Sequence, residues 1–179
     1  MALKNGNAQN RIAKESLFAA LMILMGEKQF KSISITEITR KAGVSRMAFY
    51  RNYDTTEDII VDYLEENFVS YAKDMGARGP GACADSIRIF FTYFKNQSTL
   101  IRNLIASGMT HLLLESFSHF LHSLSHSIVC DKKLSPALEK YSIAFIAGGI
   151  YKVVIEWAKD DMAESDERMA EIVGRILAG

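Results

Sequence analysis

Apolar residues recur along much of this chain every three to four positions, which is the period of an amphipathic α-helix. The first expected helix covers about residues 10 to 25 and ends at Gly26. Strand-like alternation of Val, Ile and Thr is absent from the sequence, and Pro occurs only at Pro80 and Pro136. The pattern therefore predicts an all-α protein of about nine helices. The apolar side of the first helix is expected to contain Ile12, Leu17, Leu21 and Leu24.

Two short helices joined at a glycine are expected next. Ser34 and Glu37 have the spacing of a capping box, in which each side chain bonds the other residue's backbone N–H at a helix start. Gly43 ends that helix, because the chain must turn sharply there and glycine tolerates positive φ. Ser45 then caps a short helix from Arg46 to about Asn52. The pattern is typical of a helix-turn-helix.

The remaining helices form a second, larger region. Asp54 and Glu57 have capping-box spacing and are expected to open a helix that runs to about Met75. A glycine-rich stretch from Gly76 to Gly81 follows, which we expect to be a flexible connection. Further helices are expected near residues 84–95, 98–106, 108–129, 136–160 and 166–178. We therefore expect two domains, a helix-turn-helix domain (1–56) and a helical domain (57–179).

The chain has no net charge, but its charge is distributed unevenly. Residues 1–53 carry nine Lys and Arg against three acidic residues, a balance of +6, and the remainder carries twelve against eighteen, a balance of −6. A basic head on an acidic body is expected of a protein whose head alone touches a polyanion. Chance clustering of surface charge is the alternative.

Cysteine usage and hydropathy limit where the protein acts. Cys83 and Cys130 are the only cysteines, too few for a disulfide framework or a zinc site. Each is either a redox-sensing thiol or a small buried hydrophobe, and a reducing cytoplasm suits both. The apolar run from Leu17 to Met25 lacks a following cleavage site, and we expect all apolar runs to be too short to span a bilayer. A cytoplasmic protein without membrane contact is predicted.

The helix-turn-helix candidate covers residues 34–53, and its residues divide into an inner and an outer set. The inner residues are small or apolar and lock the two helices at a steep angle: Ile35, Ile38, Ala42, Val44 and Phe49. The outer residues of the second helix are Arg46, Met47, Ala48, Tyr50, Arg51 and Asn52. An α-helix fits the major groove of DNA, where base edges present distinguishable donors, acceptors and methyl groups. The second helix is therefore predicted to contact DNA.

This segment resembles the DNA-binding domain of the TetR family of bacterial regulators over about residues 10 to 70. The family pattern is matched by Ser34, Ile35, Ile38, Ala42, Gly43, Val44, Ser45, Phe49, Tyr50, Tyr53, Glu57 and Asp58. The resemblance implies that DNA phosphates are held by Ser34, Thr36, Tyr50 and Asn52. It implies that bases are contacted by Arg46, Met47 and Ala48. Lys41, Ser45 and Arg51 complete the candidate DNA-binding set.

Three residues depart from the family pattern. Thr39 replaces the usual Ala, Met47 replaces a common Gly, and Thr56 stands where the family usually places a phosphate-binding Lys. Without that cation, DNA affinity depends on other basic residues of the head, unless these only form a solvated surface. The candidates are Lys14, Arg40, Lys41 and Arg51.

The C-terminal segments 145–157 and 162–169 resemble a domain frequent in TetR-like regulators of Gram-positive bacteria. The resemblance implies a homodimer in which the last two helices of each subunit form a four-helix bundle. Gly148 and Gly149 lie inside an apolar helix, and glycine weakens a helix unless another element packs closely against it. That element is either a helix of the partner chain or a neighbour in the same chain.

The resemblance also implies that the second domain contains a site for a small apolar or aromatic effector. The region is rich in Phe90, Phe91, Tyr93, Phe94, Met109, Phe117, Phe120 and Trp157. The residues predicted to line a pocket are Phe90, Phe94, Met109, Phe117, Phe120 and Trp157. The alternative for each of them is an ordinary place in the hydrophobic core.

A polar stripe runs along the expected helix 108–129. At about 100° per residue it is formed by His111, Glu115, His119, His122 and His126. Imidazoles at such spacing are able to ligate zinc or nickel, or to form a pH-sensitive face. The alternative is the solvated side of an amphipathic helix, and this is the interpretation we adopt, with no metal assigned.

Together these patterns predict a homodimeric repressor that binds a palindromic operator in double-stranded DNA and responds to a ligand that alters the spacing or flexibility of its two heads. The alternative is a helical ligand- or protein-binding dimer with secondary DNA binding, acting through a partner protein. Thr56 and the His stripe are the features that support it. No Ser/His/Asp, paired-carboxylate or phosphate-cradling glycine pattern occurs at a usable spacing, so neither catalysis nor a cofactor is expected.

Overall fold

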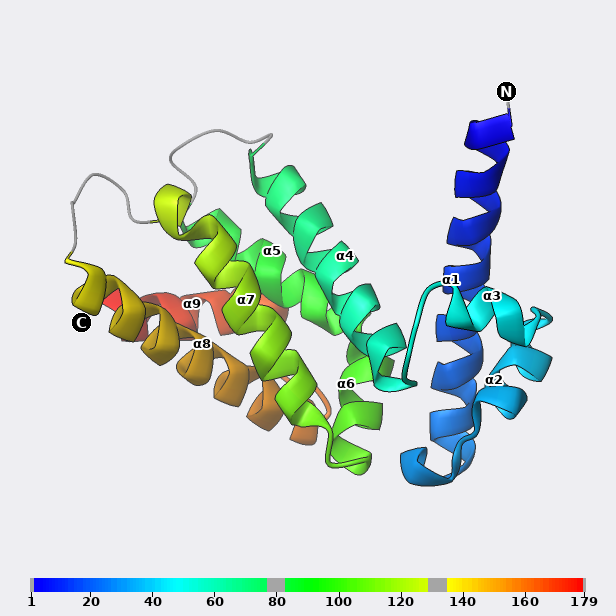
Figure 1. Ribbon diagram of the computed structural model, residues 1–179. Coiled ribbons are helices and arrows are strands. Elements are labelled where there is room, and N and C mark those ends of the chain that lie inside the picture. Colours follow the sequence, from blue (N-terminus) through cyan, green and yellow to red (C-terminus); the bar gives the residue numbers. More distant parts are fainter. Residues whose placement is uncertain (1, 77–82, 129–134, 179) are drawn as a thin grey trace.

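The computed structural model describes residues 2–76, 83–128 and 135–178, and all regular structure within them is helical, which confirms the all-α prediction. Figure 1 shows the arrangement. The helices are α1 (Ala2–Glu27), η1 (Phe30–Ser32, a 3-10 turn), α2 (Ile35–Ala42), α3 (Arg46–Tyr50), α4 (Glu57–Gly76), α5 (Cys83–Asn96), α6 (Ser98–Ala106), α7 (Thr110–Ile128), α8 (Pro136–Lys159) and α9 (Asp166–Ala178).

The helix boundaries agree closely with the sequence pattern in the body and less well in the head. α6 and α9 have the predicted limits, whereas α1 begins at Ala2 rather than near residue 10, and α3 ends at Tyr50 rather than near Asn52. Ile12 was expected on the inner side of α1, but its side chain is 57% exposed. Most of the expected flexible stretch, Cys130, and the side chains of Cys83 and His126 lie outside the described residues.

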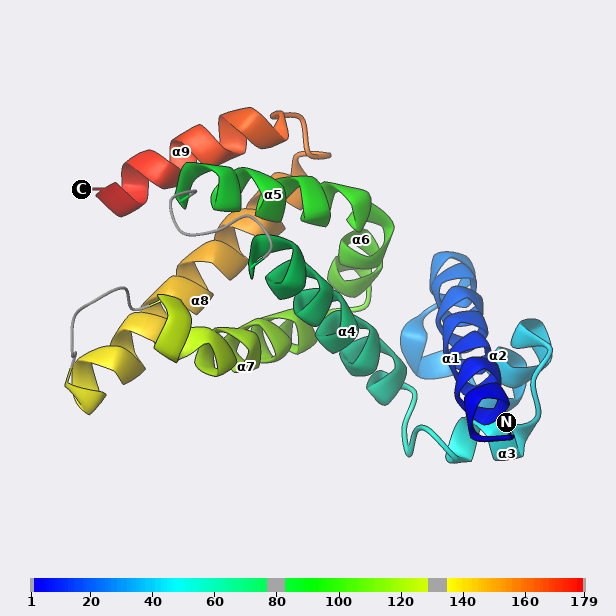
Figure 2. The ribbon, with the colours of Figure 1, turned by 90° about the horizontal axis from the view of Figure 1, so that it is seen from above.

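The helices form an N-terminal head and a larger body. In Figures 1 and 2 the first three helices gather at one end of the molecule, and α4 leads from them into the body. Within the body α5 packs on α9, α7 packs on α8, and α4 packs on α7. The head surface that carries α2 and α3 faces away from α5 to α9, so it is free to meet a large partner.

The head is held together by a small apolar core. The side chains of Leu17 and Leu21 in α1, Ile38 in α2 and Phe49 in α3 are each 0% exposed. Burial of one such side chain contributes about 1.5–3 kcal/mol relative to leaving it in water. Ile35, Ala42 and Val44 pack on this core as half-buried residues, as the inner set predicts. This core fixes the angle at which α3 leaves α2.

The turn between α2 and α3 depends on Gly43. Its φ of 67° and ψ of 26° are left-handed, and the N–H of Val44 donates to the carbonyl of Thr39 at 3.0 Å. Residues with a Cβ are strained in this conformation. The predicted role of Gly43 is thus confirmed.

The start of α4 is capped by different residues from those expected. Thr55 and Asp58 form the reciprocal pair: the N–H of Asp58 donates to Thr55 Oγ1 at 3.3 Å, and the N–H of Thr55 donates to Asp58 Oδ2 at 2.8 Å. The predicted pair of Asp54 and Glu57 is wrong by one position. Two overlapping D/T-x-x-D/E patterns occur in this segment, and only the backbone geometry selects between them.

α8 contradicts the expectation that every apolar run is too short to cross a bilayer. In the described part of the chain it is the one helix long and apolar enough to do so, by length and composition, and only about a third of its apolar stretch is buried. Its exposed apolar residues are Leu138, Tyr141 and Phe145. The inner side of α8 packs on α7 and α6, so these three residues form an apolar patch on its outer side.

We predict that Gly43→Ala lowers the free energy of unfolding by about 1–2 kcal/mol, because alanine is strained at positive φ. No atom lies within 4 Å of a Cβ built at this position, so the effect is conformational rather than steric. Gly26→Ala is the matched control, since that site is equally open but has no positive φ. Thermal unfolding of both variants measures the difference, and equal stabilities would contradict the strain argument.

Candidate nucleic-acid interface and interior cavity

α3 presents a compact outer face built by five residues and their caps. Ser45 begins the helix, because its hydroxyl accepts the N–H of Ala48 at 3.1 Å. Phe49 is fully buried and anchors the helix, while Met47 is 73% exposed and Tyr50 is 48% exposed. The helix is short, so its orientation depends on the anchor and the cap rather than on its own backbone bonds.

Arg46 and Tyr50 form one unit on this face. The guanidinium of Arg46 donates to the hydroxyl of Tyr50 at 3.4 Å, and it lies 5.9 Å from the centre of the Tyr50 ring. These two residues were predicted to have separate roles, one toward bases and one toward phosphate. Their contact means that either residue restricts the rotamers of the other.

The N-terminus of α2 has its own polar arrangement. The Ser34 hydroxyl accepts the N–H of Glu37 at 3.3 Å, and Glu37 Oε2 accepts the N–H of Ser34 at 3.0 Å, so the predicted capping box is confirmed. Lys28 Nζ lies 2.5 Å from Glu37 Oε1. The Lys28 ammonium and the bonds from Ser34 lower the pKa of Glu37 from 4.5 to about 2. Thr36, two residues after Ser34, is exposed.

The basic residues of the head differ in how free they are. Lys14 forms ion pairs with Asp62 at 2.7 Å and Glu66 at 3.3 Å, so it does not supply the missing cation. Lys41 pairs with Glu27 at 2.9 Å. Arg40 and Arg51 are exposed and take part in no ion pair among the described residues. Of the four candidates, they are therefore the ones most available to phosphate.

Two residues of the segment between α3 and α4 are engaged within the chain. The Asn52 amide donates to the Ala48 carbonyl at 2.8 Å, and both residues are half-buried. Thr56, in the place of the usual phosphate-binding Lys, donates its hydroxyl to Glu57 Oε2 at 3.0 Å. A phosphate contact from Asn52 would thus require its amide to leave the carbonyl.

The aromatic residues predicted to line a pocket are brought together only in part. Phe90, Phe94, Phe117 and Phe120 share one buried cluster, in which Phe120 stacks on Phe68 at 4.9 Å between ring centres. Met109 is also buried. Trp157 lies apart against Phe91, 5.4 Å between centres, and donates its indole N–H to the Glu164 carbonyl at 3.1 Å. Of the six residues, only Phe94 lines the small interior cavity between α4, α5, α6 and α7.

A small cavity of about 10 Å³ lies in the body, with walls from α4, α5, α6 and α7. Its lining is Tyr63, Leu64, Asn67, Phe68, Tyr93, Phe94, Gln97, Leu100, Ile101, Leu104 and Leu113. The hydroxyl of Tyr63 donates to Gln97 Oε1 at 2.8 Å. The hydroxyl of Tyr93 is buried without a hydrogen-bond partner among the described residues. Burial raises the pKa of Tyr93, so the group stays a neutral phenol.

Sequence reasoning missed most of these polar cavity residues. Tyr93 was noticed only as one aromatic among many, and Asn67 and Gln97 were not noticed at all. A polar residue on the inner side of a largely apolar helix was the available signal, because such residues need a buried partner. The partner, however, comes from another helix, and pairing between helices is not visible in one sequence.

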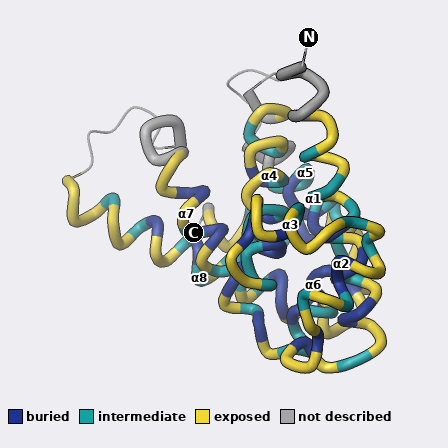
Figure 3. Tube along the Cα trace, turned by 45° about the vertical axis from the view of Figure 1, so that its right-hand side comes forward, coloured by how far each residue is buried: buried dark blue, intermediate teal, exposed yellow. Residues whose placement is uncertain are grey.

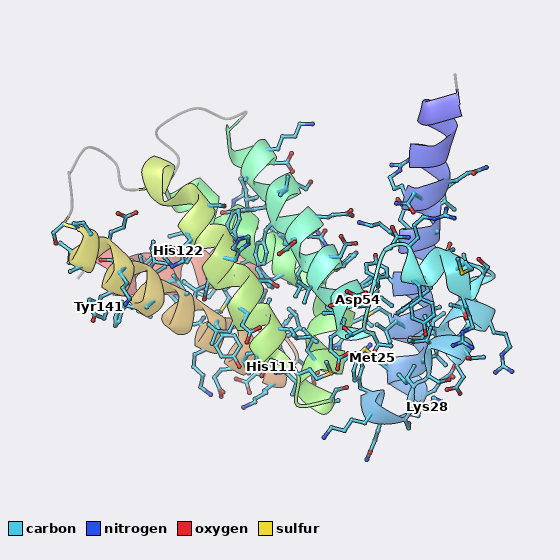
Figure 4. All side chains as sticks on the ribbon, viewed as in Figure 1. Met25, Lys28, Asp54, His111, His122 and Tyr141 are labelled. Carbon is cyan, nitrogen blue, oxygen red and sulfur yellow. The ribbon has the colours of Figure 1, made fainter. Side chains whose placement is uncertain are left out.

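The described part of the His stripe does not form a metal site. His111, His119 and His122 are exposed, and Figure 4 shows His111 and His122 at separate levels of α7. His119 Nδ1 lies 3.7 Å from Glu65 Oε1. No group of three His, Cys, Asp or Glu side chains capable of holding a metal ion occurs among the described residues. The stripe is solvated as far as the described side chains extend.

An exposed apolar stripe runs along the first half of α8, and separate exposed apolar residues lie at the end of α9. Tyr141 and Phe145 are 67% and 78% exposed, and Figure 3 shows much of the first half of α8 in the colour of exposed residues. Ile176 and Leu177 of α9 are 66% and 50% exposed. No atom of the described chain lies within 4 Å of a Cβ built at Gly148 or Gly149, so no intrachain neighbour packs closely there.

Comparison with known proteins places these features in context. The family model of the transcriptional regulator C-terminal region, a TetR C-terminal family, matches residues 83–179. A helix-turn-helix-type transcriptional regulator of Haemophilus influenzae is 22% identical over 171 residues, covering 89% of this chain and 82% of that protein.

Solved structures share the fold. A protein of Listeria innocua superposes with a TM-score of 0.81 at 15% identity, covering 96% of this chain and 92% of that chain. The transcriptional regulator FadR from Bacillus subtilis, solved in complex with stearoyl-CoA, gives a TM-score of 0.58 at 15% identity, covering 91% and 96%.

We predict that Glu37→Gln destabilises the head at neutral pH and that this effect fades in acid. The pKa of Glu37 is lower in the folded protein than its ordinary 4.5, so its carboxylate stabilises the fold above about pH 4.5. That stabilisation is lost as the pH falls toward about 2. The gap in Tm between parent and variant, measured across this range, should therefore close. Glu115→Gln, at an exposed site, is the control.

Proposed function

Because the chain belongs to the TetR family of transcriptional regulators, we propose that it is a ligand-responsive repressor that binds a palindromic operator as a homodimer. Its outer α3 face carries this proposal, since Arg46, Met47 and Tyr50 stand exposed on a helix that is fixed by a buried anchor. A helix of this width enters the major groove with its side chains toward base edges. The protein acts where its operator lies, in the cytoplasm.

DNA phosphates are contacted by the groups around this helix. Arg40 and Arg51 are exposed without an ion pair in the described chain, and Ser34 and Thr36 stand at the exposed N-terminus of α2. Phosphate contacts position a protein on DNA without reading sequence. Lys41 joins them only by leaving Glu27. The set proposed for DNA therefore remains Ser34, Thr36, Lys41, Ser45, Arg46, Met47, Ala48, Tyr50, Arg51 and Asn52.

The second subunit covers α8 and α9. The stripe of Tyr141, Phe145 and the open backbone at Gly149 is apolar and without a cover in the single chain. A two-fold axis brings the same patch of a second copy onto it, which buries both at once. Glycine at the centre allows the two helix backbones to approach closely. The dimer then carries two α3 helices for two half-sites.

Ligand control operates through the body. Helix α4 forms one wall of the cavity. The same helix leads from the head into the body (Figure 1), so a ligand that moves α4 also moves the head. The FadR neighbour was solved with stearoyl-CoA, which supports a ligand site in proteins of this fold. A ligand that binds one arrangement better than the other shifts the population of operator-competent dimers.

We predict that Arg46→Ala weakens specific operator binding by about 1–3 kcal/mol and relaxes the base preference at one position. Tyr50→Phe removes a hydroxyl directed at phosphate, so it should weaken binding to all DNA sequences by the same factor. Because the two side chains touch, the double variant should lose less than the sum of the single losses.

The measurement is a salt-dependent mobility-shift titration on the neighbouring genomic DNA. Arg102→Ala, at an exposed arginine of α6, is the control for loss of charge. If Arg46→Ala and Tyr50→Phe both bound this DNA as tightly as the parent protein, the assignment of α3 to operator binding would be wrong. Binding without any sequence preference would favour the alternative, a helical dimer that acts through a partner protein.

A further prediction concerns the dimer. Phe145→Glu places a charge at the centre of the proposed interface, so the protein should become monomeric and lose operator affinity. Val69→Glu is the matched control, because Val69 is a 68% exposed apolar residue of α4 outside the stripe. Analytical ultracentrifugation measures both variants. A Phe145→Glu protein that stays dimeric would place the interface elsewhere.

A further inference from the structure

The chemistry of the cavity wall restricts what the effector is. Seven of the eleven lining residues are Leu, Ile or Phe, and the other four are Tyr63, Asn67, Tyr93 and Gln97. No charged side chain lines the cavity. A charged ligand group placed there would be desolvated without a counter-ion, which is strongly unfavourable. The wall is therefore suited to an uncharged molecule.

The buried hydroxyl of Tyr93 marks the point where a polar ligand group is recognised. Its proton has no acceptor among the described residues, although nearly all buried polar groups in proteins are paired. The neighbouring Gln97 side chain interacts with this hydroxyl as a donor, which acts to lower the pKa of Tyr93. The Gln97 oxygen is already occupied by the Tyr63 hydroxyl, at 2.8 Å. A ligand oxygen that accepts from Tyr93 would give this proton the acceptor that the described chain does not supply.

Tyr63 connects this point to the head. Its ring stacks on Phe18 of α1, with 3.5 Å between ring centres and 8° between planes, while its hydroxyl reaches Gln97 in the cavity. A ligand group that competes for Gln97 releases the hydroxyl of Tyr63. The Tyr63 ring is then free to move against Phe18, and this movement displaces α1 in the head.

The size of the cavity makes occupancy a conformational event. A volume of about 10 Å³ holds about one water molecule, so a larger molecule requires α4 to move relative to α5 and α6. The same helix is tied to the head where the Tyr53 hydroxyl donates to Asp62 at 2.7 Å. Ligand binding and head position are therefore coupled through α4.

We propose that the effector is an uncharged, mainly apolar molecule with one hydrogen-bonding oxygen, bound by Tyr93 and Gln97, and that Tyr63 transmits its binding to the head. The proposal rests on the proposed function of a ligand-responsive regulator. It excludes an acyl-CoA as the ligand of this cavity, because no cationic side chain lines the cavity to bind phosphates.

The first test compares benzyl alcohol with toluene and benzoate, which share its ring but carry no polar group or a negative charge. We expect benzyl alcohol alone to raise the Tm of the parent protein and to have no such effect on Tyr93→Phe. Without ligand, Tyr93→Phe should itself raise Tm by about 2–4 °C, since it removes a buried hydroxyl that lacks a partner. The proposal would be overturned if benzyl alcohol and toluene raised the Tm of the parent equally, or if benzyl alcohol left it unchanged. It would also be overturned if Tyr93→Phe were less stable than the parent, because a bound water would then already satisfy Tyr93.

The second test separates signal transmission from binding. Tyr63→Phe keeps the ring on Phe18 but removes the bond to Gln97, so benzyl alcohol should still raise its Tm while the ratio of operator affinities without and with benzyl alcohol falls toward one. Tyr151→Phe, which removes a 2.8 Å bond from the Tyr151 hydroxyl to Thr110 Oγ1 away from the cavity lining, is the control and should respond as the parent does. An unchanged ratio in Tyr63→Phe would remove its role in transmission.

The two levels of failure are distinguishable. If the parent binds no operator DNA with sequence preference, the proposed function fails whatever the cavity binds. If the parent binds operator and stearoyl-CoA releases it while benzyl alcohol does not, the regulator stands and the inference about an uncharged effector is wrong.

Discussion

Helix α4 takes part in the packing of both halves of the molecule, and the remaining architecture depends on this. It contacts α1 in the head, where Tyr63 stacks on Phe18, and it contacts α7 in the body, where Phe68 stacks on Phe120. Ile59 and Ile60 near its start are fully buried. The polar bonds of Asp62 with Lys14 and Tyr53 add direction to this packing, because hydrogen bonds constrain angle where apolar contacts do not. The head is therefore positioned by α4 rather than attached by a loose linker.

The basic residues of the head serve two purposes: some form ion pairs within the chain, and others are left to contact DNA. Lys14 lies in the basic half of the sequence, but its ammonium holds α1 to α4 through Asp62 and Glu66. Lys28 holds the capping carboxylate of Glu37. The cations left for DNA are mainly arginines, whose planar, always charged groups suit phosphates and base edges. A net charge counted along the sequence thus overstates the charge that DNA meets.

The apolar surface is divided in a similar way. The aromatic cluster around Phe68 is sealed within the chain, whereas the stripe on α8 with Tyr141 and Phe145 is open. The body encloses only a small cavity, and the Tyr93 hydroxyl in its wall has no acceptor for its proton among the described residues. The open stripe produces a reason to associate. The sealed aromatic cluster and the open stripe therefore lie on different helices, the first on α4, α5 and α7 and the second on α8.

The sequence by itself determined the helical class, most helix limits in the body, the turn at Gly43 and the anchor at Phe49, because these depend on local periodicity, caps and backbone freedom. It did not decide which residues line the cavity, which carboxylate binds Lys14, or whether Thr55 or Asp54 caps α4. Each of these is settled by the distance between side chains on different helices or by the path of the backbone at one turn. Such distances arise only when the helices pack, so the tertiary structure alone decided them.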